Sequence, residues 1–287
     1  MGRLILSINL LPLSALPSLP SLQLAVVGHV EWMQFLEVDH LPSPGATAHA
    51  LNALEEPAGG GAVVAVQLAR LLGCPVQLFT ALGSDSLGRR SLQRLRQLGV
   101  QVEVVWRDAP TRRGISMVDG RADRAITVLG ERLTPTAADP LPWRDLADCD
   151  AVFATAADAA GLRACRAARI LAATPRVGLP VLQEVLVGLD ALIGSGLDSG
   201  EHVPDGSLSI PPLLRIATEG AAGGFVDPGG RYRAASLDGP LRDSYGCGDS
   251  FAAGVLVGMA AGWSLDQVIS LGCHSGARCA SSFGPYA

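Results

Sequence analysis

Asp243-Ser-Tyr-Gly-Cys-Gly-Asp-Ser-Phe-Ala-Ala-Gly254 is the most informative stretch of this 287-residue chain. Gly246 and Gly248 lack the side chains that would hold an anion away from the backbone. The apolar residues that follow predict a helix from about 250 to 261, whose first turn offers unpaired N–H groups and the positive end of the helix dipole. The stretch therefore predicts a site for a phosphoryl group.

A carboxylate, Asp249, lies in the same turn. Bound phosphate repels a carboxylate, so this placement is explained if Asp249 removes the proton from an attacking hydroxyl. The alternative is that Asp249 caps the helix through hydrogen bonds to its first N–H groups. The stretch by itself leaves both interpretations open.

The composition is typical of a compact enzyme. With 48% hydrophobic and 17% charged residues, the chain can bury one large core. A net charge of −5 without any basic run gives no electrostatic footprint for nucleic acid or for an anionic membrane. No stretch is long and apolar enough to span a bilayer. We therefore expect a small-molecule substrate, with neither nucleic acid nor membrane as partner.

All 22 basic residues are Arg. The absence of Lys excludes a P-loop lysine and a Schiff-base mechanism, so ATP would be held by backbone amides and Arg. The six cysteines form no C-x-x-C pair, which favours reduced thiols and a cytoplasmic location. Cys247, at the helix start, is either a thiol of lowered pKa or only a small residue that fills its place.

Short apolar runs alternate with helical patterns along the chain, which indicates an α/β fold with a parallel sheet. We expect helices at 62–72 and 87–98, and strands at 24–27, 76–81, 151–154, 177–179, 191–193 and 214–218. Segments 32–52 and 115–129 break this alternation, and the second predicts a hairpin that turns near Asp119. Residues 1–23 form an apolar run broken by prolines. We interpret it as an upstream extension or an early start rather than as a secretory leader.

The chain resembles the PfkB carbohydrate kinase family, which includes ribokinase. The family motif D-T-x-G-A-G-D-x-F is matched at Asp243, Gly246, Gly248, Asp249 and Phe251. Further matches follow in the family's order, at Val26-Val27-Gly28, Val38 to Gly45, Gly59-Gly60-Gly61 and Gly83 to Gly88. The resemblance covers nearly the whole chain from about Leu24 to Pro285.

The resemblance implies a ribokinase-like three-layer α/β/α sheet with a small β-sheet lid. Residues 24–287 would form the kinase domain, with lid segments at about 31–54 and 111–130, and residues 1–23 would be an N-terminal extension. Such a lid excludes water from the phosphoryl donor. Lid-to-lid dimers occur in the family, so a homodimer through the lid is one expectation, with Trp32 and Phe35 either at that contact or in the pocket wall.

The resemblance also assigns site residues by position. Asp249 would be the general base, and the amides of Gly246, Cys247, Gly248 and Asp249 would form an anion hole. On the nucleotide side, the positions assigned to ATP contacts are Thr218, Gly220, Gly223 and, beside the adenine, His274.

Two kinds of metal ion are implied in the same way. Mg²⁺ would accompany ATP, and the family's N-x-x-E motif falls on Ser195 to Asp198, where Asp198 would accept hydrogen bonds from metal-bound waters. Asp243 matches the aspartate that, in many members, lies beside a monovalent cation such as K⁺. The backbone near Ala280 and Gly284 would complete that second site.

The acceptor side departs from the family pattern, although Gly59 and Gly60 are retained there as expected substrate contacts. The family's early Asp falls on Met33, which cannot accept a strong hydrogen bond from a sugar hydroxyl. Glu31 lies two residues earlier on the same side of an extended strand and is a candidate substitute. Val63 or Val64 stands where the family has an Asn. We therefore expect a less polar pocket.

These residues together predict an ATP-dependent kinase that phosphorylates a hydroxyl of a small carbohydrate-like or nucleoside-like substrate. The alternative is a weak or inactive relative that binds a nucleotide or metabolite as a sensor, motivated by Met33, Val63 and the altered Ser195 to Asp198 segment. Asp249 favours the kinase, because inactive relatives more often lose the base. A nicotinamide-dependent oxidoreductase is disfavoured, since no G-x-G-x-x-G follows the first strand.

Overall fold

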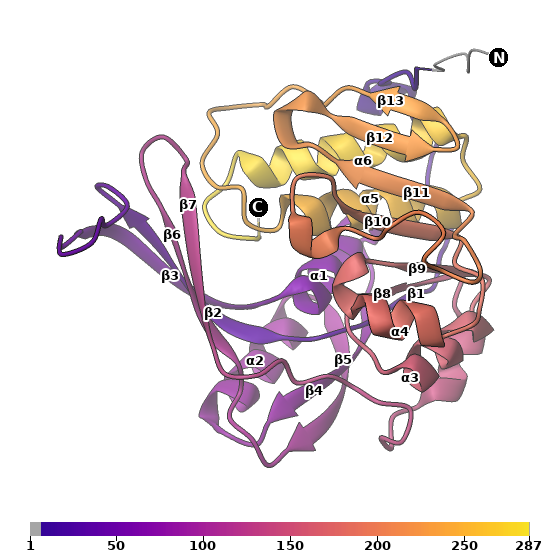
Figure 1. Cartoon of the computed structure of the whole chain (residues 1–287), viewed down its shortest axis with the longest axis horizontal. Coiled ribbons are helices and arrows are strands. Elements are labelled where there is room, and N and C mark those ends of the chain that lie inside the picture. The colour runs from indigo at the N-terminus through magenta and orange to yellow at the C-terminus, as the bar shows by residue number, and fades with distance from the viewer. Residues whose placement is uncertain (1–6, 287) are drawn as a thin grey trace.

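The computed structural model describes residues 7–286, which form two sheets with helices around the larger one (Figure 1). Within these residues, nine strands form the large sheet in the order β13-β12-β11-β10-β9-β8-β1-β4-β5. The strands are parallel from β5 to β11, and β12 and β13 continue the sheet in antiparallel pairing. Their bounds are β1 Leu24–Val27, β4 Val76–Gly83, β5 Val100–Arg107, β8 Ala151–Ala154, β9 Ile170–Ala173, β10 Ala191–Ser195, β11 Leu214–Thr218, β12 Gly224–Asp227 and β13 Gly230–Tyr232.

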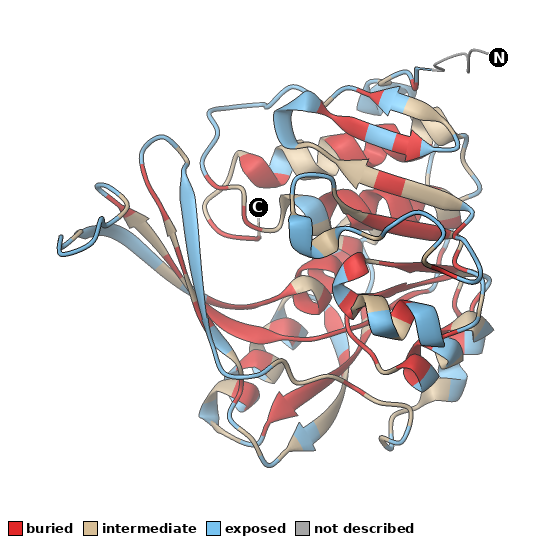
Figure 2. Cartoon of the chain, in the orientation of Figure 1, coloured by how far each residue is buried: buried red, intermediate tan, exposed pale blue. Residues whose placement is uncertain are grey.

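Helices cover both faces of the large sheet, and the central strands are buried between them (Figure 2). Alternate residues of β1 show this division, because Leu24 and Val26 join one core cluster whereas Ala25 and Val27 join the other. The first cluster contains residues of α1, α2, α5 and α6, and the second those of α3 and α4. The helices are α1 Gly60–Leu72, α2 Ser86–Gln97, α3 Ala159–Ala164, α4 Leu179–Glu184, α5 Cys247–Ala260 and α6 Leu265–Ala280. This is the expected three-layer α/β/α arrangement.

The order of the strands reverses beside β1. The chain runs from β1 outward through β4 to β5, and then returns to β8 on the other side of β1. Open parallel sheets bind ligands at such a reversal, beyond the carboxyl ends of the strands. Gly28 and His29 follow β1 there and Thr155 follows β8, with the Thr155 N–H donating to Val27 O at 2.8 Å.

The small sheet projects from one side of the molecule (Figure 1). Its order is β3-β2-β6-β7, in which β2 pairs parallel to β6 and the outer strands are antiparallel. The bounds are β2 Glu31–Val38, β3 Ala50–Ala58, β6 Arg113–Val118 and β7 Arg124–Leu129. Most of β2 is buried, whereas every residue of β7 is exposed (Figure 2). The predicted hairpin turn at Asp119 joins β6 to β7.

One predicted strand is wrong. Residues 177–179 do not form a strand, because Val177 ends a short 3-10 helix, Pro175–Val177, and Leu179 begins α4. Gly178 between them has φ +104°, and Pro at 175 and 180 lacks the N–H that a sheet ladder needs. The real strand is β9, which precedes this turn. A short apolar run cannot by itself distinguish a buried strand from a buried helix start.

The described part of the N-terminal segment, residues 7–23, packs on the same core. Ile8 and Leu22 are buried in the first core cluster. The N–H of Ile8 donates to Arg231 O at 2.9 Å, and the N–H of Leu11 donates to Ser270 Oγ at 2.8 Å on α6. We therefore propose that the folded unit includes these residues as well as the domain expected from residue 24 onward. None of the helices in residues 7–286 has the length and apolarity that crossing a membrane requires.

Candidate active site

A cleft of about 710 Å³ lies between the lid and the carboxyl ends of β1, β8, β10 and β11. It contains residues from the lid, from the start of α1 and from the start of α5, which are far apart in the sequence. Those used below are His29, Glu31, Gly59, Gly60, Arg112, Arg124, Arg132, Arg176, Ser195, Asp198, Glu201, Thr218, Gly220, Ser244 and Gly246 to Asp249. The cleft thus occupies the position at which an open parallel sheet binds its ligand.

The anion loop, which we define as Gly246 to Asp249, forms the start of α5. The helix begins at Cys247, earlier than predicted, and Gly246 precedes it in the left-handed conformation with φ +78°. A Cβ on Gly246 would lie 3.1 Å from Val63 Cγ1. Within residues 7–286, the N–H groups of Gly248 and Asp249 have no backbone acceptor, so they remain available to an anion.

Asp249 lies directly across from the start of α1. A Cβ on Gly60 would come within 3.3 Å of Asp249 Oδ1, so the two chain segments meet in the cleft. The Asp249 carboxylate accepts no hydrogen bond from any described residue. Burial raises its pKa to about 6, an increase that Glu201 and Glu31 support and that Arg176 opposes. A carboxyl group in this position can accept a proton near neutral pH.

Glu31 reaches the cleft, but its oxygens are engaged by the protein. The Tyr245 hydroxyl donates to Glu31 Oε1 at 3.3 Å, and Nε of Arg112 lies 3.2 Å from Glu31 Oε2. The same Tyr245 hydroxyl accepts the Gly59 N–H at 3.2 Å. Tyr245 therefore joins the lid strand β2, the start of α1 and the anion loop.

Met33 and Val63 do not line the cleft. Both are fully buried, and they pack with Phe35 and Tyr245 in a third core cluster beneath it. Trp32 is also buried, with the Arg90 guanidinium 4.3 Å from its ring centroid, so Trp32 and Phe35 pack inside this chain rather than on its surface. The cleft is lined by charged side chains, four of them arginines, together with apolar ones such as Ile126 and Phe153, so it is not simply the less polar pocket expected from the sequence.

The residues assigned to the nucleotide divide into two groups. Thr218 and Gly220 line the cleft at the end of β11. Gly223 does not, and a Cβ there would lie 2.1 Å from Tyr232 O, so this glycine serves a tight turn. His274 lies on α6 with its Nε2 2.8 Å from Leu11 O, against the N-terminal segment. The structure thus brings two of the four together.

Asp198 lines the cleft beside Glu201, which was not predicted from the sequence. Asp198 Oδ2 and Glu201 Oε1 each lie 2.5 Å from the guanidinium of Arg176. Glu201 also accepts the Ser195 N–H at 2.7 Å. No cluster of three or more His, Cys, Asp or Glu that could hold a metal ion occurs in residues 7–286. Asp198 Oδ1 also accepts the Gly200 N–H at 2.8 Å, so this arrangement fits an Mg²⁺ that would be held mainly by ATP phosphates and water, with Asp198 interacting only through water.

Asp243 is buried and ties two loops together. Its Oδ1 accepts the Tyr245 N–H at 2.9 Å, and its Oδ2 accepts the Gly284 N–H at 3.2 Å. The carbonyl of Ala280 accepts the Arg242 N–H at 2.8 Å. Each of these oxygens accepts an amide hydrogen bond, so Asp243 holds the two loops together, and we derive no step through a monovalent cation.

Cys247 differs from one sequence interpretation. Its pKa is raised, first by a hydrogen bond with the Cys279 thiol and then by burial, so the thiol stays protonated. A lowered pKa at the helix start is therefore wrong for this residue. The Cys247 N–H donates to Ser244 O at 3.5 Å, so the available N–H groups of the anion loop are those of Gly248 and Asp249.

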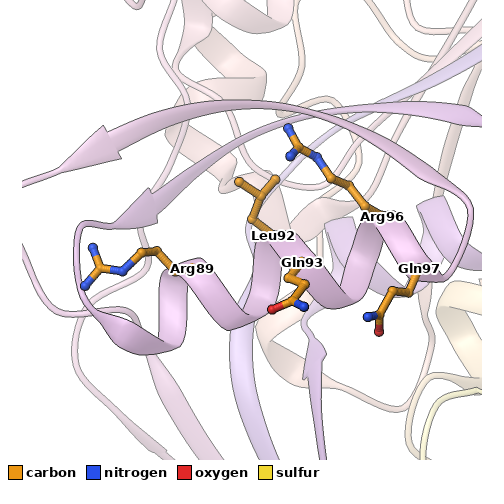
Figure 3. Close-up of a pocket in the computed structure, with 5 residues that line it drawn as sticks. All are labelled: Arg89, Leu92, Gln93, Arg96 and Gln97. Carbon is orange, nitrogen blue, oxygen red and sulfur yellow. The ribbon is translucent and has the colours of Figure 1, made fainter.

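A second hollow, of about 450 Å³, lies along α2 (Figure 3). Only one helix lines it, with Arg89, Leu92, Gln93, Arg96 and Gln97. These side chains point in different directions and include no carboxylate (Figure 3). The hollow offers no converging chemical groups, in contrast to the cleft.

A comparison with protein families decides the assignment. The model described as pfkB family carbohydrate kinase matches residues 21–173, more than half of the chain. The chain belongs to the pfkB family of carbohydrate kinases. Its reaction class is therefore phosphoryl transfer with an alcohol group as acceptor. Among curated proteins, none matches the chain by sequence.

Solved structures with the same fold include other pfkB-type kinases. Ribokinase from Thermotoga maritima has 19% identity and a TM-score of 0.72, covering 93% of this chain and 95% of its own. Ribokinase from Cryptococcus neoformans var. grubii, in complex with ADP, has 22% identity, a TM-score of 0.72 and coverages of 93% and 96%. Adenosine kinase from Sinorhizobium meliloti has 18% identity, a TM-score of 0.71 and the same coverages. The anion loop lies beyond the residues that the family model matches, and these structures share the fold over 93% of the chain.

Four arginines in the cleft were also missed by the sequence analysis: Arg112, Arg124, Arg132 and Arg176. Arg112 and Arg132 flank the β6–β7 hairpin, and Arg124 lies in β7. Arg176 lies in the 3-10 helix Pro175–Val177, whose last residue was predicted to begin a strand. The available signal was the exclusive use of Arg among 22 basic residues, but that signal does not say where the side chains converge.

Proposed function

We propose that this pfkB-family chain transfers the γ-phosphoryl group of ATP to a hydroxyl of a small carbohydrate-like substrate, with Asp249 as the general base. The observation that carries this proposal is the position of the Asp249 carboxylate. The carboxylate faces Gly60 in the cleft and accepts no hydrogen bond from any described residue. In the same helix turn, the N–H groups of Gly248 and Asp249 have no backbone acceptor among the described residues. A hydroxyl bound there would meet the base and the phosphoryl group together.

Each part of the cleft has a role in this proposal. The N–H groups of Gly248 and Asp249 stabilise charge on the transferring phosphoryl group. Thr218 and Gly220 contact the nucleotide, and Asp198 orients a water of the Mg²⁺ shell. Mg²⁺ supplied with ATP would neutralise phosphate charge, and Asp198 is the residue that would face its water shell. Closure of the lid removes water that would otherwise hydrolyse ATP.

The direct test is release of ADP from Mg·ATP by the purified chain, measured against sugars, sugar phosphates, sugar acids and nucleosides. We expect turnover with at least one class and only slow ADP release without an acceptor. ATP binding without turnover on any of these hydroxyl compounds would instead support the sensor alternative. ATP binding is measured separately by calorimetry, so that a misfolded preparation is recognised.

The two glycines of the anion loop should separate folding from catalysis. A Cβ on Gly248 meets nothing within 4 Å, and Gly248 lines the cleft where we place the phosphoryl group. We therefore expect Gly248→Ala to fold normally, but its turnover should fall about tenfold or more. The loss should not exceed the loss caused by removing one oxyanion-hole donor. Gly246→Ala, at φ +78° and 3.1 Å from Val63, should instead lower the midpoint of urea unfolding. Equal turnover in Gly248→Ala and the parent would argue against the anion hole.

The pKa of Asp249 predicts how activity depends on pH. The base acts only when ionised, so kcat/KM should fall as pH drops below about 6, approaching tenfold per pH unit. Because the pKa is raised from 3.8, the folded protein binds more protons than the unfolded chain between pH 3.8 and about 6. Stability therefore falls as pH rises through this window. Rate measurements from pH 5 to 8 check the first statement, and a profile without a break near 6 would contradict it.

A further inference from the structure

Three of the cleft arginines converge on one buried histidine. His29 follows β1, is 5% exposed and lines the cleft, and its Nδ1 is buried without a hydrogen-bond partner among the described residues. The pKa of His29 is lowered well below 6.5, first by burial and then by the charges of Arg132, Arg112 and Arg176. The histidine is therefore neutral, and the positive charge around it comes from guanidinium groups.

These arginines differ in how far their charge is already neutralised. Arg176 is paired with Asp198 and Glu201, and Arg112 lies against Glu31. Arg132 has no carboxylate within ion-pair distance in residues 7–286. Its one hydrogen bond, of 2.8 Å, goes from its terminal nitrogen to the carbonyl of Arg176.

Arg132 is also partly removed from water. Its Nε is buried and has no acceptor among the described residues, and its pKa is lowered, first by burial and then by the charge of Arg112. Burying an unpaired charge costs free energy that a bound anion would recover. A guanidinium matches the geometry of carboxylate and phosphate oxygens, which it binds through paired N–H groups.

The position of Arg132 separates it from the nucleotide side. It follows β7 at the base of the lid, and the charged groups that act on it are Arg112, Glu31 and Arg176. Glu31 lies on β2 and Arg112 directly before β6, both at the lid, whereas Arg176 follows β9 and also pairs with Asp198. The unpaired charge thus faces the acceptor half of the cleft, beside Glu31 and His29.

We propose that the acceptor carries a negatively charged group, a carboxylate or a phosphate, in addition to the hydroxyl that receives the phosphoryl group, and that Arg132 binds this charge with support from His29 and Arg112. This inference rests on the proposed function. Glu31 offers little repulsion to such an anion, since Tyr245 and Arg112 engage its oxygens.

The first experiment measures binding rather than turnover, with Asp249→Asn protein so that no phosphoryl transfer occurs. Calorimetry compares matched sets of one carbon skeleton, such as glucose, gluconate and glucose 6-phosphate, and the corresponding sets for pentoses and other hexoses. We expect at least one charged member to bind ten times or more tightly than its neutral counterpart. The affinities of the carboxylate and phosphate compounds show which anion is preferred. If no charged member in any set exceeds its neutral counterpart, the inference is overturned.

The second experiment uses variants with the compound that binds best. Arg132→Ala should weaken its binding by about 10- to 100-fold, which is the loss expected for one charge-assisted contact. Arg132→Lys should recover part of that loss, because the charge remains. The control is Arg121→Ala, whose side chain is 80% exposed at the lid turn and pairs with Asp119 and Asp123. Equal weakening by Arg121→Ala and Arg132→Ala, or no weakening by Arg132→Ala, overturns the inference.

Kinetics with wild-type Asp249 distinguish failure of this inference from failure of the proposed function. In the parent, Arg132→Ala should raise the KM of the acceptor and leave the KM of ATP unchanged. One outcome is phosphorylation of a neutral sugar that requires Asp249 and whose KM does not change in Arg132→Ala. This outcome would leave the kinase assignment in place and overturn the anion site. Tight, Arg132-dependent binding of a charged compound without any ADP release would support the anion site and count against the kinase assignment.

Discussion

Asp249→Asn should lower turnover by about 10²- to 10⁴-fold, the usual contribution of a general base, while ATP still binds. Asn has nearly the same shape but cannot accept the proton of the acceptor hydroxyl. Because the Asp249 carboxylate accepts no hydrogen bond from any described residue, the replacement leaves no protein donor unpaired. The measurements are ADP release at saturating acceptor and ATP affinity by calorimetry.

The matched control is Asp238→Asn, an exposed aspartate outside the cleft, which should keep the turnover of the parent. The Asp249→Asn protein should also lose the part of the pH-dependent stability that arises from the raised pKa of Asp249. A folded Asp249→Asn protein with undiminished turnover would show that Asp249 is a capping residue, the other interpretation of the sequence.

Gly61→Ala should strongly destabilise the fold at the junction of β1 and α1. A Cβ on Gly61 would lie 2.6 Å from the carbonyl oxygen of His29 and 2.8 Å from the carbonyl carbon of Gly28. Both are backbone atoms, so no side chain can rotate away, and α1 would have to move off the end of β1. We expect a loss of about 3 kcal/mol or more in the free energy of unfolding, at or above the upper end for overpacking.

Urea unfolding followed by circular dichroism measures this loss. Gly188→Ala provides the control, because a Cβ there meets nothing within 4 Å and the residue does not have positive φ. It should change stability by less than about 0.5 kcal/mol. Similar stability of Gly61→Ala and Gly188→Ala would mean that the contact between α1 and β1 is looser than described.

The family motifs predicted the fold because each of them depends on local backbone requirements. Gly59 and Gly246 have φ of +84° and +78° at helix starts, which L-residues with side chains rarely adopt. Such requirements leave a mark in the sequence itself. The strand at 170–173 was missed because Ile-Leu-Ala-Ala has little strand propensity by itself and is buried by tertiary packing.

The charge of the cleft could not be predicted in the same way. Arg112 and Arg132 lie on either side of the lid hairpin, and Arg176 follows β9, so only the folded chain brings them to His29. Met33 illustrates the opposite limit. Its position in the family pattern suggested a place in the pocket, but the pleat of β2 and the packing of Phe35 and Tyr245 put it in the core.

The Tyr245 hydroxyl lies between the Gly59 N–H and Glu31, so it connects the lid strand with the start of α1 next to the anion loop. An acceptor that moves the lid strand carrying Glu31 also acts on the residue that immediately precedes Gly246, and an anion that fixes the loop acts back on the lid. By reciprocity, whatever factor the acceptor adds to the affinity for ATP, ATP adds to the affinity for the acceptor. In Tyr245→Phe, which lacks this hydroxyl, we expect that binding of one substrate no longer changes the affinity for the other.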